Sequence, residues 1–375
     1  MKFSIDKAAF VSGLQQGINV VSTKLVMPIL SNVLIEVTGN EVAFTTTNLD
    51  LGIRCKVKAN VESEGAITLP AKKMATIIRS LPSETVHFEL NNSRVRISSG
   101  SSHFEIMGLP AEDFPALPDF LEENKHSVPQ GEFLRLLKNV SYAQSRDENR
   151  YILNGVYFSL ENEALMVVAT DGRRLSMMTK MLNEGKGVSP TGIIVPSKTI
   201  AEIERLLGQG ESMWFAFNER QVVFSIAVQG NEKSGLVGDI SIVSKVIDGN
   251  YPNFKQVIPQ VTESRVKLDR QLALDCIQRV ALVASENKNS IKMRFADNSL
   301  ELSAASAEYG EAHEKIAIQY DGNPVEIAFN PAFLCDPLRA LVQDEVFFEF
   351  KDEMSPGVFR TLDSFLCVVM PLRVG

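Results

Sequence analysis

A single pattern of apolar and polar positions occurs three times along the chain. Its clearest copy places Met74, Ile78 and Leu81 on one face of a helix, because apolar residues spaced by three and four positions share a side. An apolar run at 67–69 precedes this helix, and an alternating run at 85–90 follows it. This copy therefore predicts a strand, an amphipathic helix and a hairpin, in that order.

The same pattern returns at residues 193–217 and again at 327–350. Pro70, Pro196 and Pro331 stand where the three helices would begin, a position that proline favours. A strand, a second amphipathic helix and two further strands come before each copy, so the flanking elements repeat with it. The three predicted domains are 1–122, 123–262 and 263–375.

Two helices are expected in each domain. They are predicted at 6–22, 71–81, 130–144, 197–207, 269–281 and 331–342. Pro337 lies inside the last of them. Because proline has no backbone N–H and crowds the preceding turn, we expect this helix to kink or break there.

The composition is typical of a protein with several hydrophobic cores that is not exported. The chain has 375 residues, of which 45% are hydrophobic, enough for domains of roughly 100 to 150 residues. Its first residues lack the apolar region of a signal peptide, and no apolar run approaches the ~18 residues of a membrane helix. Four widely separated cysteines argue against a disulfide framework or a zinc site. We expect a cytoplasmic protein without a membrane partner.

The charge is divided between helices and the rest of the chain. The six predicted helices hold eleven basic and seven acidic residues, a net charge of +4. The whole chain carries −8, so the remainder carries −12. Basic residues such as Lys72 and Arg79 lie opposite the apolar stripe of their helix. For a single helix, charged residues that merely cover a solvated face explain this equally well.

No catalytic arrangement is evident in the sequence. It has no phosphate-binding glycine-rich loop, no HExxH and no GxSxG motif, and its four histidines have no second ligand at metal spacing. Asp171-Gly172 between apolar runs predicts a tight hairpin turn rather than a catalytic carboxylate. We expect no catalytic residue, no metal and no cofactor.

Five segments together resemble one protein family over essentially the whole chain. They are residues 27–32, 150–155, 169–175, 248–252 and 368–373. The chain is similar to the β sliding clamps of bacterial DNA polymerase III, processivity factors that encircle DNA. The resemblance implies an α+β clamp fold of three repeated domains, each with two helices backed by antiparallel sheets. It also implies a head-to-tail homodimeric ring with the helices lining the hole.

The resemblance implies contact with double-stranded DNA, held without sequence preference at the nucleoid during replication. A positive inner surface and an acidic outer surface would attract duplex into the ring and repel it elsewhere. The residues implied near DNA are Lys24, Lys72, Lys73, Arg79, Arg135, Lys138, Arg150, Tyr151, Lys198 and Arg205.

A second implied site is a pocket for short motifs of the polymerase III catalytic subunit, the clamp loader and other clamp-binding proteins. Its aliphatic and methionine side chains suit apolar anchors, and its arginines suit polar ends of a peptide. The pocket residues are Leu153, Thr170, Gly172, Arg173, Arg174, Leu175, Pro252, Val257, Val368, Val369, Met370, Pro371, Leu372 and Arg373. Without the resemblance, a plain edge strand is the better interpretation of the last six. Arg173 and Gln256 depart from the family's commonest residues.

Subunit contacts are implied between the first domain of one chain and the third domain of another. Phe104 and Ile106 would meet Leu282 and Val283. Two rival functions are a β-rich interaction scaffold without DNA encirclement and an enzyme acting on nucleic acid. The enzyme would need a carboxylate cluster that the sequence does not display.

Overall fold

The computed structural model describes residues 1–21, 27–118, 124–182, 191–229, 235–284 and 289–373. Lys24, expected near DNA, lies outside the described residues. The chain divides into two compact units. Among the described residues, the first comprises 1–21, 27–118, 124–134, 201–229 and 235–246, and the second comprises 135–182, 191–200, 247–284 and 289–373.

The first unit is built on two antiparallel sheets. Its strands are β1 (Lys2–Asp6), β2 (Asn32–Thr38), β3 (Glu41–Thr47), β4 (Leu51–Lys58), β5 (Asn60–Ser63), β6 (Gly65–Pro70), β7 (Thr85–Asn91), β8 (Arg94–Ser99), β9 (Ser102–Met107), β10 (His126–Pro129), β15 (Ser212–Phe217), β16 (Gln221–Ala227) and β17 (Leu236–Lys245). One sheet has the order β5-β1-β7-β8-β9, and the other has the order β10-β15-β16-β17-β4-β3-β2-β6.

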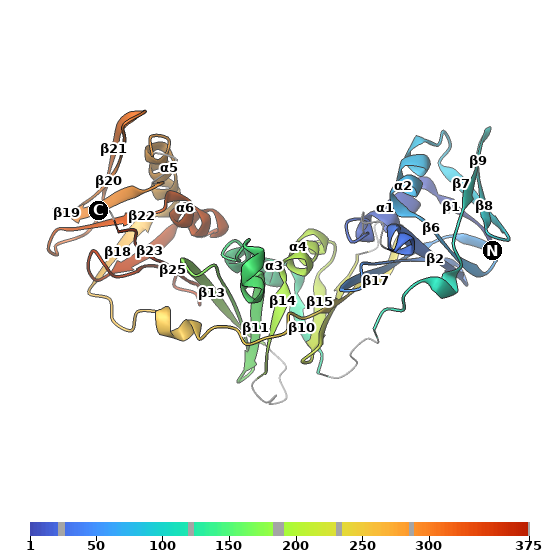
Figure 1. Cartoon of the computed structure of the whole chain (residues 1–375), viewed down its shortest axis with the longest axis horizontal. Coiled ribbons are helices and arrows are strands. Elements are labelled where there is room, and N and C mark those ends of the chain that lie inside the picture. The colour runs from blue at the N-terminus through green and yellow to red at the C-terminus, as the bar shows by residue number, and fades with distance from the viewer. Residues whose placement is uncertain (22–26, 119–123, 183–190, 230–234, 285–288, 374–375) are drawn as a thin grey trace. The chain divides into compact units, whose positions relative to one another are not determined.

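Helices α1 (Lys7–Gly17) and α2 (Ala71–Ser80) pack together against these strands (Figure 1). Asp6 begins α1 by accepting a hydrogen bond from the amide of Ala9 at 2.9 Å. Phe10 of α1 stacks on Phe88 of one sheet and meets Phe44 of the other edge-on, each with 4.9 Å between ring centroids. The apolar face of α1 therefore joins the two sheets in one core.

The second unit repeats this plan. Its strands are β11 (Gly155–Glu161), β12 (Ala164–Thr170), β13 (Arg174–Met181), β14 (Thr191–Pro196), β18 (Ser264–Asp269), β19 (Ile291–Ala296), β20 (Ser299–Ser306), β21 (Gly310–Ala317), β22 (Val325–Phe329), β23 (Glu345–Phe350), β24 (Gly357–Arg360) and β25 (Leu366–Val369). They form an eight-stranded sheet, β14-β11-β12-β13-β25-β24-β23-β18, and a four-stranded sheet, β21-β20-β19-β22.

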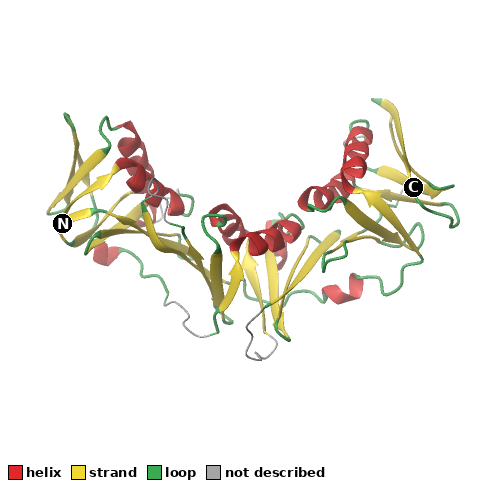
Figure 2. Cartoon of the chain, turned by 180° about the vertical axis from the view of Figure 1, so that it is seen from behind, coloured by secondary structure: helices red, strands yellow, loops and turns green. Residues whose placement is uncertain are grey.

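Helices α5 (Arg270–Ala281) and α6 (Pro331–Ala340) lie side by side in this unit (Figure 2). The core beneath them is rich in phenylalanine, and Phe295 of β19 stacks on Phe350 of β23 at 4.1 Å. Helices α3 (Gln130–Ser141) and α4 (Ser197–Leu206) contribute residues to both units. Short 3₁₀ helices occur at η1 (Pro28–Ser31), η2 (Ala111–Asp113), η3 (Glu148–Leu153) and η4 (Phe254–Val257).

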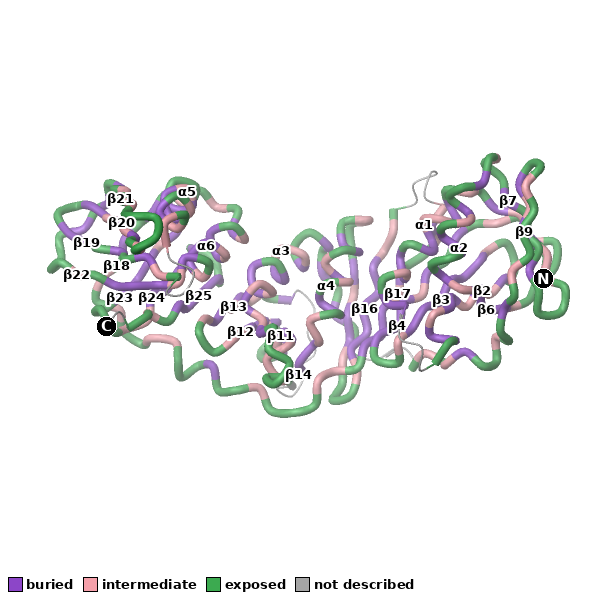
Figure 3. Tube along the Cα trace, turned by 45° about the horizontal axis from the view of Figure 1, so that its top comes forward, coloured by how far each residue is buried: buried purple, intermediate pink, exposed green. Residues whose placement is uncertain are grey.

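The six predicted helices are confirmed within the described part of the chain, with narrower limits. Buried positions follow the strands and the inner helix faces (Figure 3). The first helix ends at Gly17 rather than at 22, because the Thr46 hydroxyl donates a hydrogen bond to the Gly17 carbonyl at 2.9 Å.

The expected break at Pro337 is wrong. Helix α6 continues to Ala340, and the amide of Leu341 still bonds to the Pro337 carbonyl at 3.1 Å. Proline lacks the N–H that would bond to the carbonyl four residues earlier, so the helix loses one hydrogen bond there. Only three residues of α6 follow Pro337, and the helix continues through them.

Candidate functional site

The predicted turn at Asp171-Gly172 is confirmed as the tip of the β12–β13 hairpin. Gly172 has a φ of +83°, a conformation that glycine adopts at little cost. A Cβ atom there would lie 2.8 Å from Arg150 Nη1. The same Arg150 nitrogen donates a hydrogen bond to the Asp171 carbonyl at 3.0 Å, so the turn and η3 lie in contact.

Strand β25 joins this hairpin to the end of the chain. Leu175 of β13 pairs with Val368 of β25, and the amide of Met370 bonds to the Arg173 carbonyl at 2.9 Å. Beyond the strand, the amide of Leu372 bonds to the Ala328 carbonyl at 2.7 Å. Leu175 and Val368, which are 193 positions apart and were predicted in one pocket, are thus brought together by strand pairing.

An apolar cluster lies against this pair of strands. Leu175 and Val368 are buried together with Phe254 of η4. Tyr251 packs at the cluster's edge and stacks on Tyr157 with 4.9 Å between centroids. Burial is the main reason that the pKa of the Tyr251 hydroxyl is raised above its ordinary value, so this side chain stays neutral.

The rim of the cluster is open to solvent. Val257 is 45% exposed and Met370 is 40% exposed, and both line a pocket of about 330 Å³ together with Gln256 and Pro259. Such exposure of large apolar side chains beside a concave pocket is typical of a binding surface. Of the other predicted pocket residues, Gly172, Arg173, Pro252, Leu372 and Arg373 are exposed, whereas Leu153, Thr170, Arg174 and Pro371 are half-buried and Val369 is buried.

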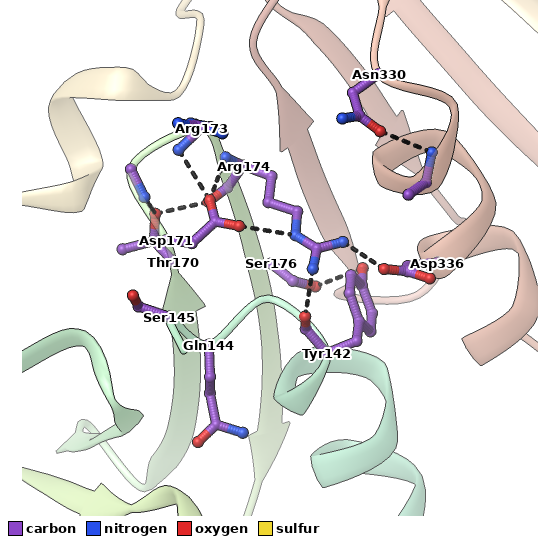
Figure 4. Close-up of polar contacts among 12 residues, drawn as sticks. Tyr142, Gln144, Ser145, Thr170, Asp171, Arg173, Arg174, Ser176, Asn330 and Asp336 are labelled. Carbon is purple, nitrogen blue, oxygen red and sulfur yellow. Dashed lines mark hydrogen bonds and ion pairs between the residues drawn. The ribbon is translucent and has the colours of Figure 1, made fainter. Parts of the chain in front are cut away.

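Arg174 has a different place from the other predicted pocket residues (Figure 4). Its side chain is only 10% exposed. Its guanidinium bonds to Asp171 Oδ2 at 3.2 Å, to Asp336 Oδ2 at 2.5 Å and to the carbonyl of Tyr142 at 2.6 Å. It also lies 4.6 Å from the ring centroid of Phe333. Arg174 therefore ties the hairpin to α6 and to the end of α3.

Sequence reasoning missed three of these partners: Tyr142, Phe333 and Asp336. Asp336 lies 162 positions from Arg174 along the chain, and no local motif links the two. Asp171 was recognised only as a turn residue. Its Oδ1 indeed accepts the amides of Arg173 and Arg174, at 2.9 and 3.0 Å, while Oδ2 accepts the Arg174 side chain.

A second, smaller pocket of about 230 Å³ lies beside the hairpin tip. Arg146, Arg150 and Arg173 line it together with Phe333. Arg150, which the resemblance implies near DNA, is thus also adjacent to the predicted peptide pocket. Arg146 was not singled out from the sequence.

The helix cations fall into two groups. Lys72, Lys73, Arg79, Lys138 and Lys198 are exposed, as is Tyr151. Arg135 is instead ion-paired with Asp363, and Arg205 bonds both to Glu202 and to the carbonyl of Gln16. The charges of the second group are therefore partly neutralised by contacts within the chain.

The residues predicted at a subunit contact lie on an edge strand and at the end of a helix. Phe104 and Ile106 belong to β9, the last strand of the five-stranded sheet. Leu282 follows α5 and is 80% exposed, and Val283 is next to it. Strand β21 is likewise the last strand of the four-stranded sheet. Edge strands of this kind can pair with another chain.

Among the described residues, no group of three or more His, Cys, Asp or Glu side chains could hold a metal ion. The four cysteines are free and buried, and burial raises the pKa of Cys55 and of Cys367 to about 12. None of the described helices is long and apolar enough to cross a membrane.

Three consecutive family models match the chain. Residues 1–118 match the N-terminal domain of the DNA polymerase III beta subunit, residues 127–253 match its central domain, and residues 255–373 match its C-terminal domain. These matches show three domains, while the limits predicted above, 1–122, 123–262 and 263–375, stay a prediction.

Relatives and solved structures agree over the full length. The beta sliding clamp of Caulobacter vibrioides (strain NA1000 / CB15N) is 34% identical over 384 residues, and that of Proteus mirabilis is 32% identical over 379, with complete coverage of both chains in each case. The crystal structure of the DNA polymerase III subunit beta from Pseudomonas aeruginosa matches with a TM-score of 0.92 at 29% identity. The beta sliding clamp of C. crescentus matches with a TM-score of 0.91 at 34% identity. Both structures cover all of this chain and are covered by it completely.

Proposed function

Because this chain belongs to the DNA polymerase III beta subunit family, it is a DNA sliding clamp for that polymerase, and we propose how its surfaces divide the task. The family is an accessory processivity factor rather than an enzyme, so the protein tethers the polymerase and performs no chemistry on DNA. The observation that carries this conclusion is the match of all three family domains, in order, along one chain. The rival scaffold and nucleic-acid enzyme functions are not favoured.

The exposed helix cations would face the duplex. Lys72, Lys73 and Arg79 of α2 are exposed on the side opposite its buried residues Met74 and Ile78. A few such charges attract the phosphate backbone without a tight grip, which suits sliding because every strong phosphate contact would slow movement. The proposed DNA-facing set also includes Lys24, Arg135, Lys138, Arg150, Tyr151, Lys198 and Arg205.

The surface around the β12–β13 hairpin would receive motifs of partner proteins. Val257 and Met370 supply exposed apolar area at the rim, and the buried cluster of Leu175 and Val368 supports it. We propose that the polymerase catalytic subunit, the clamp loader and other clamp-binding proteins compete for this surface, with Leu153, Thr170, Gly172, Arg173, Arg174, Pro252, Val369, Pro371, Leu372 and Arg373 around it. Its work would take place on the chromosome in the cytoplasm.

Two chains would close the ring head to tail. The edge strand β9 carries the exposed Phe104 and the half-buried Ile106, and the exposed Leu282 and half-buried Val283 lie at the end of α5. A heterologous contact of this kind must close after two copies, or it would propagate as a filament. Edge pairing and apolar burial would act together at each of the two contacts.

The closed ring is tested by replacing the apolar residues at the proposed contact. Leu282→Ala with Val283→Ala removes apolar area that drives association, so we expect monomers in sedimentation-velocity experiments at micromolar concentration. The matched control is Val342→Ala with Leu362→Ala, because these side chains are also exposed, at 71% and 88%, but lie elsewhere. A Leu282/Val283 variant that still sediments as a dimer would contradict the placement of this contact.

A further inference from the structure

Strand β18 is an open edge of the eight-stranded sheet. It pairs in antiparallel fashion with β23, from Ser264 opposite Phe350 to Asp269 opposite Glu345. In the part of the chain that the structure describes, no strand pairs with its other side. Half of its backbone hydrogen-bonding groups therefore face away from the sheet.

The first unit shows what fits at this position, because β1 is the counterpart of β18. Each strand ends on an aspartate, Asp6 or Asp269, that caps the following helix. Strand β1 is paired on both sides: with β7, the counterpart of β23, and with the short strand β5. In β5, Val61 pairs with Phe3 and Ser63 pairs with Lys2. The repeated domain thus accommodates an antiparallel strand at this edge.

The chain does not supply that strand in the second unit. After β21, Ile318 donates its amide to the carbonyl of Asn298 at 2.9 Å. The amides of Asn298 and Tyr320 bond back across the same turn, at 3.1 and 3.0 Å. These three bonds hold residues 318–320 to the β19–β20 turn and away from β18.

A groove of about 820 Å³ remains along the open edge. Arg265 and Lys267 of β18 and Phe347 of β23 line it, and Ala317, Ile318 and Gln319 form the facing side. Three carboxylates, Asp269, Asp344 and Glu345, also line it where β18 ends and β23 begins. The position of β18 beside β23 can be followed in Figure 1. Three strands, β25, β24 and β23, separate β18 from the hairpin strand β13, which is about 19 Å at the usual strand spacing.

Within the described ranges, the two cations of β18 form ion pairs only with carboxylates of β23, on the paired side of the strand. Arg265 lies 3.6 Å from Glu349, and Lys267 lies 2.8 Å from Glu345, and both carboxylates belong to β23. The facing residues Ala317, Ile318 and Gln319 carry no charge. In the first unit the added strand provides the missing partner, because Glu62 of β5 pairs with Lys2 of β1 at 2.6 Å. Lys2 stands at the same position as Arg265, three residues before Ile5 and Leu268 respectively.

We propose that the open edge of β18 binds an extended acidic segment of another protein by antiparallel strand addition, with carboxylates reaching Arg265 and Lys267. Backbone hydrogen bonds provide the affinity in this mode of binding, and side chains at alternate positions provide the selectivity. The interaction would leave free the pocket lined by Val257 and Met370. A partner bound at β18 could therefore stay on the clamp while the polymerase occupies that pocket.

The test uses a peptide taken from the chain itself. The probe has the sequence of residues 59–64, Ala-Asn-Val-Glu-Ser-Glu, with a photoreactive diazirine residue in place of Val61. After irradiation with the full-length protein, we expect cross-links at residues 264–269 and 317–319, located by mass spectrometry. In the first unit β5 already occupies the edge of β1, but β10 (His126–Pro129) is also an outer strand, so cross-links there would count against the proposal.

Reversing the two positive charges of β18 distinguishes binding at this site from non-specific cross-linking. Arg265→Glu with Lys267→Glu should lower cross-linking about fivefold, as expected from losing two cross-strand ion pairs and gaining repulsion. The matched control is Lys292→Glu with Arg294→Glu, two exposed cations at alternate positions of β19, which is paired on both sides. This control should label as the unchanged protein does.

Three results would overturn the proposal. The first is cross-links outside the groove. The second is an Arg265/Lys267 variant that labels as strongly as the control. The third is equal labelling by a peptide with lysine in place of Glu62 and Glu64. Circular dichroism of both variants checks that a lower signal comes from an intact fold, and an unfolded Arg265/Lys267 variant is replaced by Lys267→Glu alone, for which at least a twofold decrease is expected.

Discussion

Arg174 shows how one side chain can shape a proposed binding surface through contacts within its own chain. Three hydrogen-bonding partners and an aromatic ring of its own chain surround the guanidinium, which is largely removed from solvent. Asp336 lies on α6, so the contact holds the hairpin tip at a defined place relative to that helix. Arg174 is therefore a positioning residue, and Arg173, its exposed neighbour, is the one available to a ligand.

Replacing Arg174 by glutamine should destabilise the protein strongly. Loss of the guanidinium leaves two half-buried carboxylates without their common partner, at a cost of about 3 kcal/mol in the free energy of unfolding. Arg173→Gln is the matched control and should change it by less than about 0.5 kcal/mol. Urea denaturation followed by circular dichroism measures both. Equal effects of the two substitutions would show that Arg174 has no such role.

The sequence predicted residues whose signal is local and missed those whose partners are distant. Asp171-Gly172 was recognised as a turn because the dipeptide itself favours one. The pairing of Arg135 with Asp363 spans 228 positions, and neither residue has a neighbour that indicates it. Arg135 and Arg205 were placed near DNA by the family resemblance, which does not reveal that another part of this chain already binds them.

At the scale of elements, helices were predictable because apolar spacing and capping act within one turn or two. Asp6, Asp269 and Asn330 each cap a helix through their side chains, close to the predicted starts. Helix ends were less predictable, since the Thr46 hydroxyl, which donates a hydrogen bond to the last carbonyl of α1, comes from a strand. The persistence of α6 beyond Pro337 also depends on packing, because Pro337 and Leu338 are buried in the core.

Helix α2 provides the test of the DNA-facing surface. Reversing Lys72, Lys73 and Arg79 to glutamate would place repulsive charge along the proposed path of the duplex. We expect the amount of protein retained on nicked circular DNA after loading to fall roughly tenfold at low salt, and the difference to shrink as salt rises.

The control for this variant reverses three exposed strand lysines, Lys56, Lys245 and Lys292, and so makes the same change in net charge. Retention of the control should stay close to that of the unchanged protein. If both variants lose retention equally, net charge rather than the face of α2 governs the association.

At the scale of the whole molecule, the threefold repeat was visible in the sequence because each copy keeps the order of its elements. The differences between copies were not visible. Strand β5 covers an edge in the first unit, whereas residues 318–320 turn away from the same edge in the second because Asn298 binds them. Neither outcome follows from apolar periodicity, since β5 is short and mostly polar, and Ile318 and Tyr320 alternate as they would in a strand.

The proposed ring would hold DNA by surrounding it. The most direct measurement loads the labelled protein with its ATP-driven loader onto nicked circular DNA, then cuts the circle at one site and follows the protein that remains bound. A ring should survive moderate salt on the intact circle and leave within minutes once free ends exist. Equal retention on circular and linear DNA, or equal loss from both, would contradict the account.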